Sequence, residues 1–144
     1  MATKTAASFG SATWANEPPS EEERIRVRKE RASMRAVLAG DRMEISSLLA
    51  SPPFVDINFV SSGNCTMLHA AAARGDLEIC TFLIDKGANM QALNSLGYTP
   101  LLSAAASGKS ETVDFMVKKG ANAKVLSKRG LGVSDLLKTA AMIR

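Results

Sequence analysis

The sequence is poor in the residues that build most catalytic and metal sites. Its 144 residues include one histidine, two cysteines, one tryptophan and one tyrosine. The single His69 has no second imidazole and no nearby nucleophile and acid to complete a metal centre or a catalytic triad. Cys65 and Cys80 form no CxxC pair, and we expect both to be free thiols. We therefore predict a protein with no catalytic residue, no metal, no cofactor and no small-molecule substrate.

Long apolar runs are also missing. No stretch approaches the roughly 18 residues that a membrane-spanning helix needs. The N-terminus lacks the basic start and the apolar middle of a secretory signal. We therefore expect no membrane partner and a cytoplasmic protein, with the nucleus as the other open compartment. The remaining composition, 46% hydrophobic and 22% charged, is typical of one folded domain.

Acidic residues are absent between Phe115 and Ser134, where five residues are basic. Up to Val60 the basic and acidic residues balance at eight each, so the net charge of +4 comes from the rest of the chain. A basic end of this kind attracts an acidic protein surface or a nucleic acid. The stretch has no aromatic residue after Phe115 for base stacking and no groove-reading motif. We therefore favour a protein partner over a nucleic acid, with an acidic surface as one option.

The chain does contain a repeat with a period of 33 residues. NCTMLHAAAARG, which ends at Gly75, aligns at this offset with GYTPLLSAAASG, which ends at Gly108. An earlier copy, residues 38–50, lies at an offset of 35, and residues 129–137 restart the pattern. A fixed period of this length indicates a repeat architecture. We predict an N-terminal tail, residues 1–20, that is disordered or docked on a partner, and a repeat domain, residues 21–144, with units of about 29–62, 63–95 and 96–128 and a terminal half-unit 129–144.

Each unit contains the signals of two short helices. Thr99 is suited to cap the first helix, Pro100 to occupy its first position, and Gly108 to end it. The second helix of the middle unit begins near Asp76. Its core face is predicted to hold Ile79, Cys80, Leu83 and Ile84, and the next unit repeats this face at Val113, Met116 and Val117. One helix pair cannot bury such a face alone, so the units must stack.

These units resemble ankyrin repeats, whose pattern is G-x-TPLH-x-AA-x-x-G with a later LL-x-x-GA-D/N-x-N. The resemblance covers roughly residues 31–137. It implies an all-α ankyrin-repeat solenoid of stacked helix-turn-helix units with short β-hairpin fingers, and a non-catalytic role in binding other proteins. His69 is expected to bond Thr66, as in the family. The sequence departs from the pattern at Met67, Leu102, Gln91 and Lys124, and we expect Leu102 to loosen the hydrogen bonds of its own unit.

The resemblance also implies that the finger tips and the concave surface of the first helices bind the partner. The residues selected at these positions are Arg74, Leu96, Tyr98, Ser107, Lys128, Arg129 and Leu131. Leu96, Tyr98, Arg129 and Leu131 are the predicted anchor, because Tyr and Arg are enriched at hot spots and exposed apolar residues need an explanation. The alternative is that these side chains pack on adjacent fingers. The other matching positions are Ser62, Gly63, Cys65, Ala73, Leu93, Ser95, Ala106 and Leu126.

Two N-terminal segments leave alternatives open. The tail contains Phe9 and Trp14 and almost no charge, which fits a docking peptide better than a targeting sequence. Ser20 and Glu23 predict a capping box that opens a helix through residues 21–40. This helix has six basic side chains, which we expect to point round several sides of it. A solvated capping helix is the simpler interpretation, and a contact with an acidic partner is the alternative.

The sequence therefore predicts a protein-interaction module. In the first hypothesis it is an adaptor or regulator that binds one partner reversibly through its concave face. In the alternative it is a structural subunit permanently incorporated in a larger protein assembly. The repeat pattern predicts how the protein binds and leaves the partner open, because a fold does not fix a function.

Overall fold

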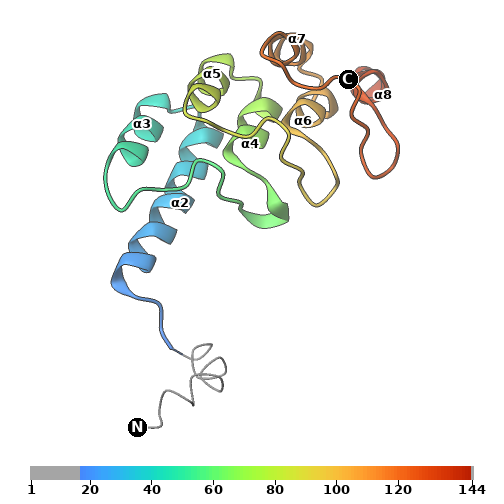
Figure 1. The fold of residues 1–144 in the computed structure, drawn as a ribbon. Coiled ribbons are helices and arrows are strands. Elements are labelled where there is room, and N and C mark those ends of the chain that lie inside the picture. Colours follow the sequence, from blue (N-terminus) through green and yellow to red (C-terminus); the bar gives the residue numbers. More distant parts are fainter. Residues whose placement is uncertain (1–16, 144) are drawn as a thin grey trace.

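The computed structural model describes residues 17–143, and its helices form two layers (Figure 1). The inner layer contains α2 (Glu21–Ala39), α4 (Met67–Arg74), α6 (Pro100–Ala106) and α8 (Val133–Ile143), and the outer layer contains α3 (Arg42–Ala50), α5 (Leu77–Asp85) and α7 (Ser110–Lys118). Helix α4 packs between α2 and α6, and α6 packs against α8. The result is the all-α stack of helix pairs that the repeat predicts. No helix in residues 17–143 has the length and hydrophobicity to cross a membrane.

The helices begin at the caps that the sequence predicts. Ser20 and Glu23 form the capping box at the start of α2. Thr66 Oγ1 accepts a hydrogen bond from the backbone N–H of His69 at 3.3 Å, and Thr99 caps α6 in the same way. Such caps satisfy N–H groups that the first turn of a helix leaves without a partner. The repeated threonines therefore fix where α4 and α6 start.

The core lies between the two layers and runs the length of the stack. The alanines of the inner helices are fully buried at Ala71, Ala72, Ala104 and Ala105, and their small side chains let neighbouring backbones approach closely. Ile79, Cys80 and Leu83 of α5 are also 0% exposed, as the periodicity predicts. The prediction is wrong at Val117, which is 41% exposed. Within residues 17–143 no further outer helix packs beyond α7 to cover it.

Candidate functional site

Three turns project from the same side of the stack, each just before an inner helix. We call them finger one (61–65), finger two (94–98) and finger three (127–131). In finger two, the Asn94 N–H donates to the Tyr98 carbonyl at 3.0 Å and the Gly97 N–H donates to the Asn94 carbonyl at 2.9 Å, and both bonds recur in the other fingers. In each finger only the first of these two backbone bonds joins the two ends, and the second closes the turn. The expected β-hairpins therefore take this simpler form. The described residues therefore contain no strand.

Adjacent fingers are bonded to each other. The Ser95 N–H and hydroxyl both donate to the carbonyl oxygen of Gly63, at 2.8 and 2.9 Å. One unit later, the Lys128 N–H donates to the Leu96 carbonyl at 3.4 Å, and the Lys128 ammonium donates to the Ser95 carbonyl at 2.9 Å. The fingers thus form one continuous surface instead of three independent loops.

His69 joins finger two to the preceding unit. Its Nε2 lies 2.8 Å from the Tyr98 carbonyl oxygen, which can only accept, so we assign the proton to Nε2. Nδ1 is then free to accept from the hydroxyl and the backbone N–H of Thr66, at 2.9 and 3.2 Å. Burial lowers the pKa of His69, whose side chain is 2% exposed. The predicted bond to Thr66 is confirmed, and the imidazole has a structural role.

The third unit lacks this connection. Leu102 stands at the position of His69 and is fully buried. Within residues 17–143 Thr99 Oγ1 accepts only from the Leu102 N–H, at 3.3 Å. Among the described residues no side chain of α6 donates to the Leu131 carbonyl, which is the equivalent of Tyr98 O. The expected loosening at Leu102 is therefore the absence of the imidazole's hydrogen bonds, both to the capping threonine and to the next finger.

The structure separates the predicted anchor into exposed and half-buried members. Leu96 is 59% exposed, and Arg129 is exposed at the equivalent position of finger three. Tyr98 and Leu131 are half-buried and pack against the core. Lys128 is exposed, but its ammonium is bonded to the neighbouring finger as described above. Only Leu96 and Arg129 of this group offer largely free side chains at the finger tips.

Arg74 and Ser107 lie elsewhere. They are at the C-terminal ends of α4 and α6, opposite the ends at which the fingers enter. Arg74 Nη1 donates to the carbonyl oxygen of Leu38 at 2.7 Å, and its Nε is 4.0 Å from Asp76. Arg74 therefore provides a hydrogen-bond donor for a carbonyl at the C-terminal end of α2. Ser107 is exposed. The structure brings the five finger residues together and leaves these two apart from them.

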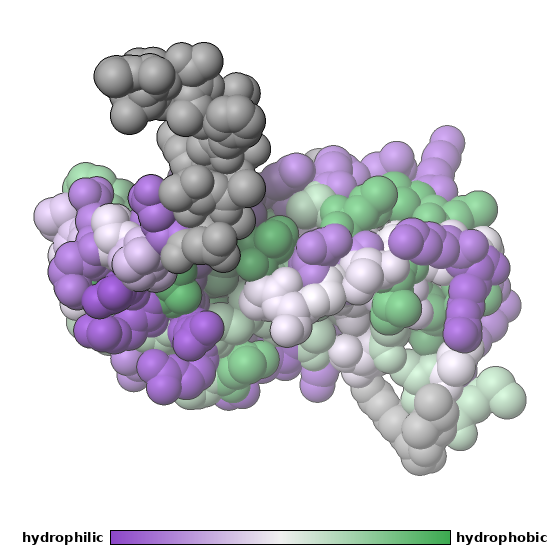
Figure 2. Space-filling view, turned by 90° about the horizontal axis from the view of Figure 1, so that it is seen from below, coloured by the Kyte–Doolittle hydropathy of each residue, from purple (hydrophilic) through white to green (hydrophobic). Residues whose placement is uncertain are grey.

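A row of exposed apolar residues runs along the fingers. Val60, Leu93 and Leu126 each come directly before a finger, lie 33 residues apart and are 55%, 58% and 59% exposed. Seen from the finger side, hydrophobic patches interrupt the hydrophilic surface over the middle and far part of the stack, whereas the end that holds α2 and α3 is largely hydrophilic (Figure 2). Sequence analysis includes Leu93 and Leu126 only among the wider matching positions and misses Val60. The 33-residue period, applied to apolar residues near the fingers, was the signal that could have found it.

Groups that could bind a metal or act as a reactive thiol are few in the described residues. In residues 17–143 no group of three or more His, Cys, Asp and Glu side chains could hold a metal ion. Cys80 is buried, and desolvation raises the pKa of its thiol to about 12. Cys65, in finger one, is only partly buried. The surface therefore offers apolar and cationic side chains for contact with another molecule.

Comparison with known proteins identifies the repeats. A family model for ankyrin repeats, in three copies, matches residues 33–127, which is more than half of the chain. No curated protein sequence matches the chain. Ankyrin repeats are generally protein–protein interaction modules. From the family match, the stacked helix pairs and the Thr66–His69 cap, the chain belongs to the ankyrin-repeat family.

Proposed function

We propose that the chain is an adaptor or regulator that binds one partner protein reversibly through its fingers and the concave surface of its inner helices. The row of Val60, Leu93 and Leu126 is the observation that supports this. Single exposed apolar residues are ordinary on protein surfaces. Three of them at equivalent positions of consecutive units, each more than half exposed, form a line that a partner can cover in one contact.

The construction of the fingers suits such a contact. Inner helices that pack side by side are about 8–10 Å apart, so the fingers they support repeat at a similar spacing. The bonds from Ser95 to Gly63 and from Lys128 to Ser95 hold neighbouring fingers in register. A surface that is already ordered loses little conformational entropy on binding. Leu96, which is 59% exposed on finger two, extends the apolar row.

The test compares two double variants of the full chain. Leu93→Glu with Leu126→Glu places charge on the row, whereas Met43→Glu with Met142→Glu changes two equally apolar side chains on α3 and α8 that are 79% and 86% exposed. Circular dichroism first confirms that both variants are folded. The proposal expects a partner, captured from native extract by the wild type and the Met variant, to be lost by the Leu variant. A partner retained equally by all three proteins contradicts the finger surface.

Exchange distinguishes an adaptor from a permanent subunit. An excess of untagged protein, added to the captured complex, should displace the tagged chain within minutes if binding is reversible. A complex that resists exchange and is retained by the Leu93→Glu, Leu126→Glu variant favours the structural subunit. In that case the chain is attached to the larger assembly through a surface other than the fingers.

A further inference from the structure

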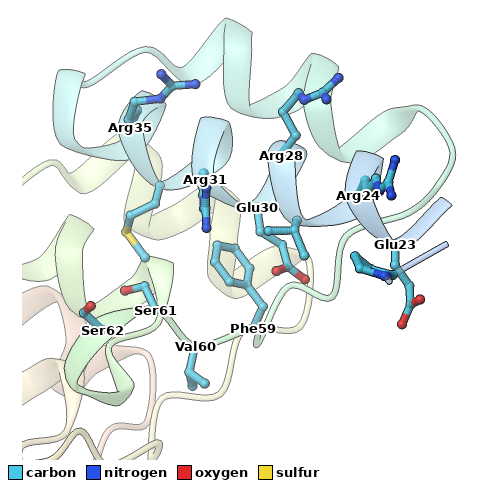
Figure 3. Close-up of a pocket in the computed structure, with 13 residues that line it drawn as sticks. Glu23, Arg24, Arg28, Glu30, Arg31, Arg35, Phe59, Val60, Ser61 and Ser62 are labelled. Atoms are coloured by element: carbon cyan, nitrogen blue, oxygen red, sulfur yellow. The ribbon is translucent and has the colours of Figure 1, made fainter. Parts of the chain in front are cut away.

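A groove lies at the N-terminal end of the stack, between α2 and residues 59–62 (Figure 3). Its volume is about 1000 Å³. Apolar side chains line it at Val27, Met34, Phe59 and Val60, and arginines line it at Arg24, Arg28, Arg31 and Arg35. We expected the basic side chains of this helix to point round several sides, but four of the six line this one groove. Lys29 points elsewhere and donates to the carbonyl of Pro53 at 3.0 Å.

The spacing of the four arginines explains why they start from the same side of α2. They are separated by four, three and four residues, and at about 100° per residue these steps place them within an arc of about 60°. Val27 and Met34 are seven residues apart and lie next to that arc. In Figure 3, Arg31 extends from α2 toward the ring of Phe59, while Arg28 and Arg35 extend from the outer side of the helix. The helix thus places an apolar strip beside a row of arginine positions, with the Arg31 side chain nearest Phe59 and the guanidinium groups of Arg28 and Arg35 on the outer side.

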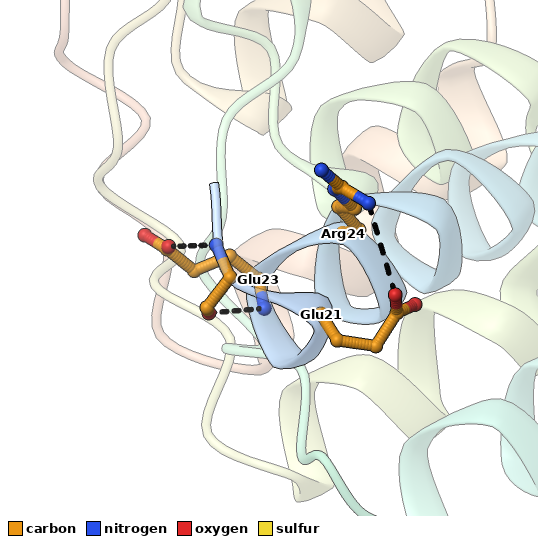
Figure 4. Close-up of polar contacts among 4 residues, drawn as sticks. Glu21, Glu23 and Arg24 are labelled. Atoms are coloured by element: carbon orange, nitrogen blue, oxygen red, sulfur yellow. Dashed lines mark hydrogen bonds and ion pairs between the residues drawn. The ribbon is translucent and has the colours of Figure 1, made fainter. Parts of the chain in front are cut away.

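Most of this positive charge has no partner. Glu23 is committed to the cap, where its Oε2 accepts from the Ser20 N–H at 2.9 Å, and hydrogen bonds from Ser20 lower its pKa (Figure 4). Arg24 lies 3.8 Å from Glu21. Within the described residues no carboxylate lies within 4.0 Å of the guanidinium groups of Arg28, Arg31 and Arg35. With four arginines against Glu23 and Glu30, the lining has a net positive charge.

We infer that this groove binds an acidic segment of a partner protein that also contributes a large apolar side chain. Carboxylates pair with guanidinium groups through charge-assisted, often bidentate hydrogen bonds. The apolar side chain would cover Val27 and Val60, which are 41% and 55% exposed. The inference rests on the proposed function, because it specifies the chemistry of one segment of the bound partner. Val60 belongs both to the groove and to the apolar row, so one partner can reach both.

Other occupants fit the groove less well. A nucleic acid would find one aromatic ring in the groove lining, that of the half-buried Phe59, on which to stack its bases. The protein's own residues 1–16 contain no Asp or Glu, so they cannot neutralise the arginines. An acidic peptide with a large apolar side chain matches both the net positive charge of the lining and its apolar strip.

The test measures the fluorescence anisotropy of a labelled peptide of about 12 residues, with four Glu, one Leu and one Phe, against the full chain. Affinity should fall as salt rises, because exposed ion pairs are screened. Arg28→Gln with Arg31→Gln should weaken binding by about tenfold or more, since two charge-assisted contacts are lost. Lys118→Gln with Lys138→Gln is the matched control. It removes the same charge from exposed positions on α7 and α8 and should change affinity by less than about twofold.

Several results would overturn the inference. Equal weakening by the arginine and lysine variants would mean that the peptide responds to net charge alone. Binding of a single-stranded oligonucleotide or of phosphatidylserine vesicles, without binding of the peptide, would assign the groove to another ligand. Binding of the peptide by a Phe9→Ala, Trp14→Ala variant but not by the wild type would mean that the protein's own tail fills the groove.

The two proposals fail separately. If the peptide does not bind but the Leu93→Glu, Leu126→Glu variant loses its partner, the groove inference is wrong and the finger surface stands. If the peptide binds as expected but the Leu variant retains its partner, the groove stands and the finger surface is wrong.

Discussion

Nε2 of His69 lies 2.8 Å from the carbonyl oxygen of Tyr98, so that α4 of one unit is bonded to the finger of the next. The same imidazole accepts from Thr66 at the start of α4. One side chain therefore fixes both the helix cap and the position of finger two. Leu96 of finger two and Leu93 directly before it, both proposed to bind the partner, depend on this connection for their placement.

Replacing His69 with leucine should reproduce in the second unit what Leu102 does in the third. The Thr66 N–H would lose its buried acceptor and the Tyr98 carbonyl would lose one of its two donors, which costs about 1–3 kcal/mol of unfolding free energy. Urea denaturation measures this loss. Arg129→Leu, at an exposed finger tip, is the control and should change stability by less than about 0.5 kcal/mol. A His69→Leu protein as stable as wild type would mean that the imidazole bonds contribute nothing net.

The same residue predicts a dependence of stability on pH. Burial lowers the pKa of His69 below its ordinary value of 6.5, so the unfolded chain binds a proton more readily than the folded chain. The contribution of the neutral His69 to the free energy of unfolding is complete above pH 6.5. It is lost as the pH falls below 6.5, with a slope of at most about 1.4 kcal/mol per pH unit from this one group. Urea midpoints between pH 7.5 and 5 measure the slope. The His69→Leu variant should lack this component, and an unchanged slope in that variant would assign it to other groups.

The two thiols should react at very different rates. Cys80 is fully buried, and the pKa of its thiol is raised to about 12, so almost none of it is thiolate at pH 8. Cys65 is partly exposed in finger one. A thiol reagent such as Ellman's reagent should titrate one cysteine in the native protein and both in denaturant. Cys65→Ser should abolish the native reaction, whereas a native reaction that survives this substitution would show that α5 opens readily.

Much of the fold follows from the sequence because the 33-residue period brings equivalent residues to equivalent places. Thr66, Thr99 and Ser20 begin helices where the pattern puts them, and the alanine runs of α4 and α6 are buried. Val117 is the exception, since helical spacing defines a face and does not say whether another helix covers it. The period predicts local structure well and the edges of the stack less well.

The site is less predictable because exposure depends on contacts between units. Tyr98 and Leu131 look like free anchor residues in the sequence, but they pack against the core. Arg74 looks like a concave-surface residue, but it donates to the Leu38 carbonyl. The groove between α2 and residues 59–62 exists only because these residues lie beside the helix. The periodicity within α2 cannot predict that contact.

Gly97 and Gly130 provide a matched test of how closely the fingers approach each other. They occupy equivalent positions of fingers two and three, with φ of 78° and 77°. An added Cβ at Gly97 would lie 2.7 Å from Lys128 Cγ and 2.9 Å from the Lys128 backbone nitrogen, whereas at Gly130 nothing lies within 4 Å. The backbone strain of an alanine is the same at both sites, so the difference between the two variants isolates the contact.

Gly130→Ala should cost about 1–2 kcal/mol of unfolding free energy, the usual penalty for a left-handed alanine. Gly97→Ala should cost about 1–3 kcal/mol more, because the Lys128 backbone cannot move aside without weakening its bond to the Leu96 carbonyl. Urea denaturation of both variants measures the difference. Equal losses would mean that finger three does not rest on finger two in solution. The continuous finger surface, on which the proposed function depends, would then be wrong.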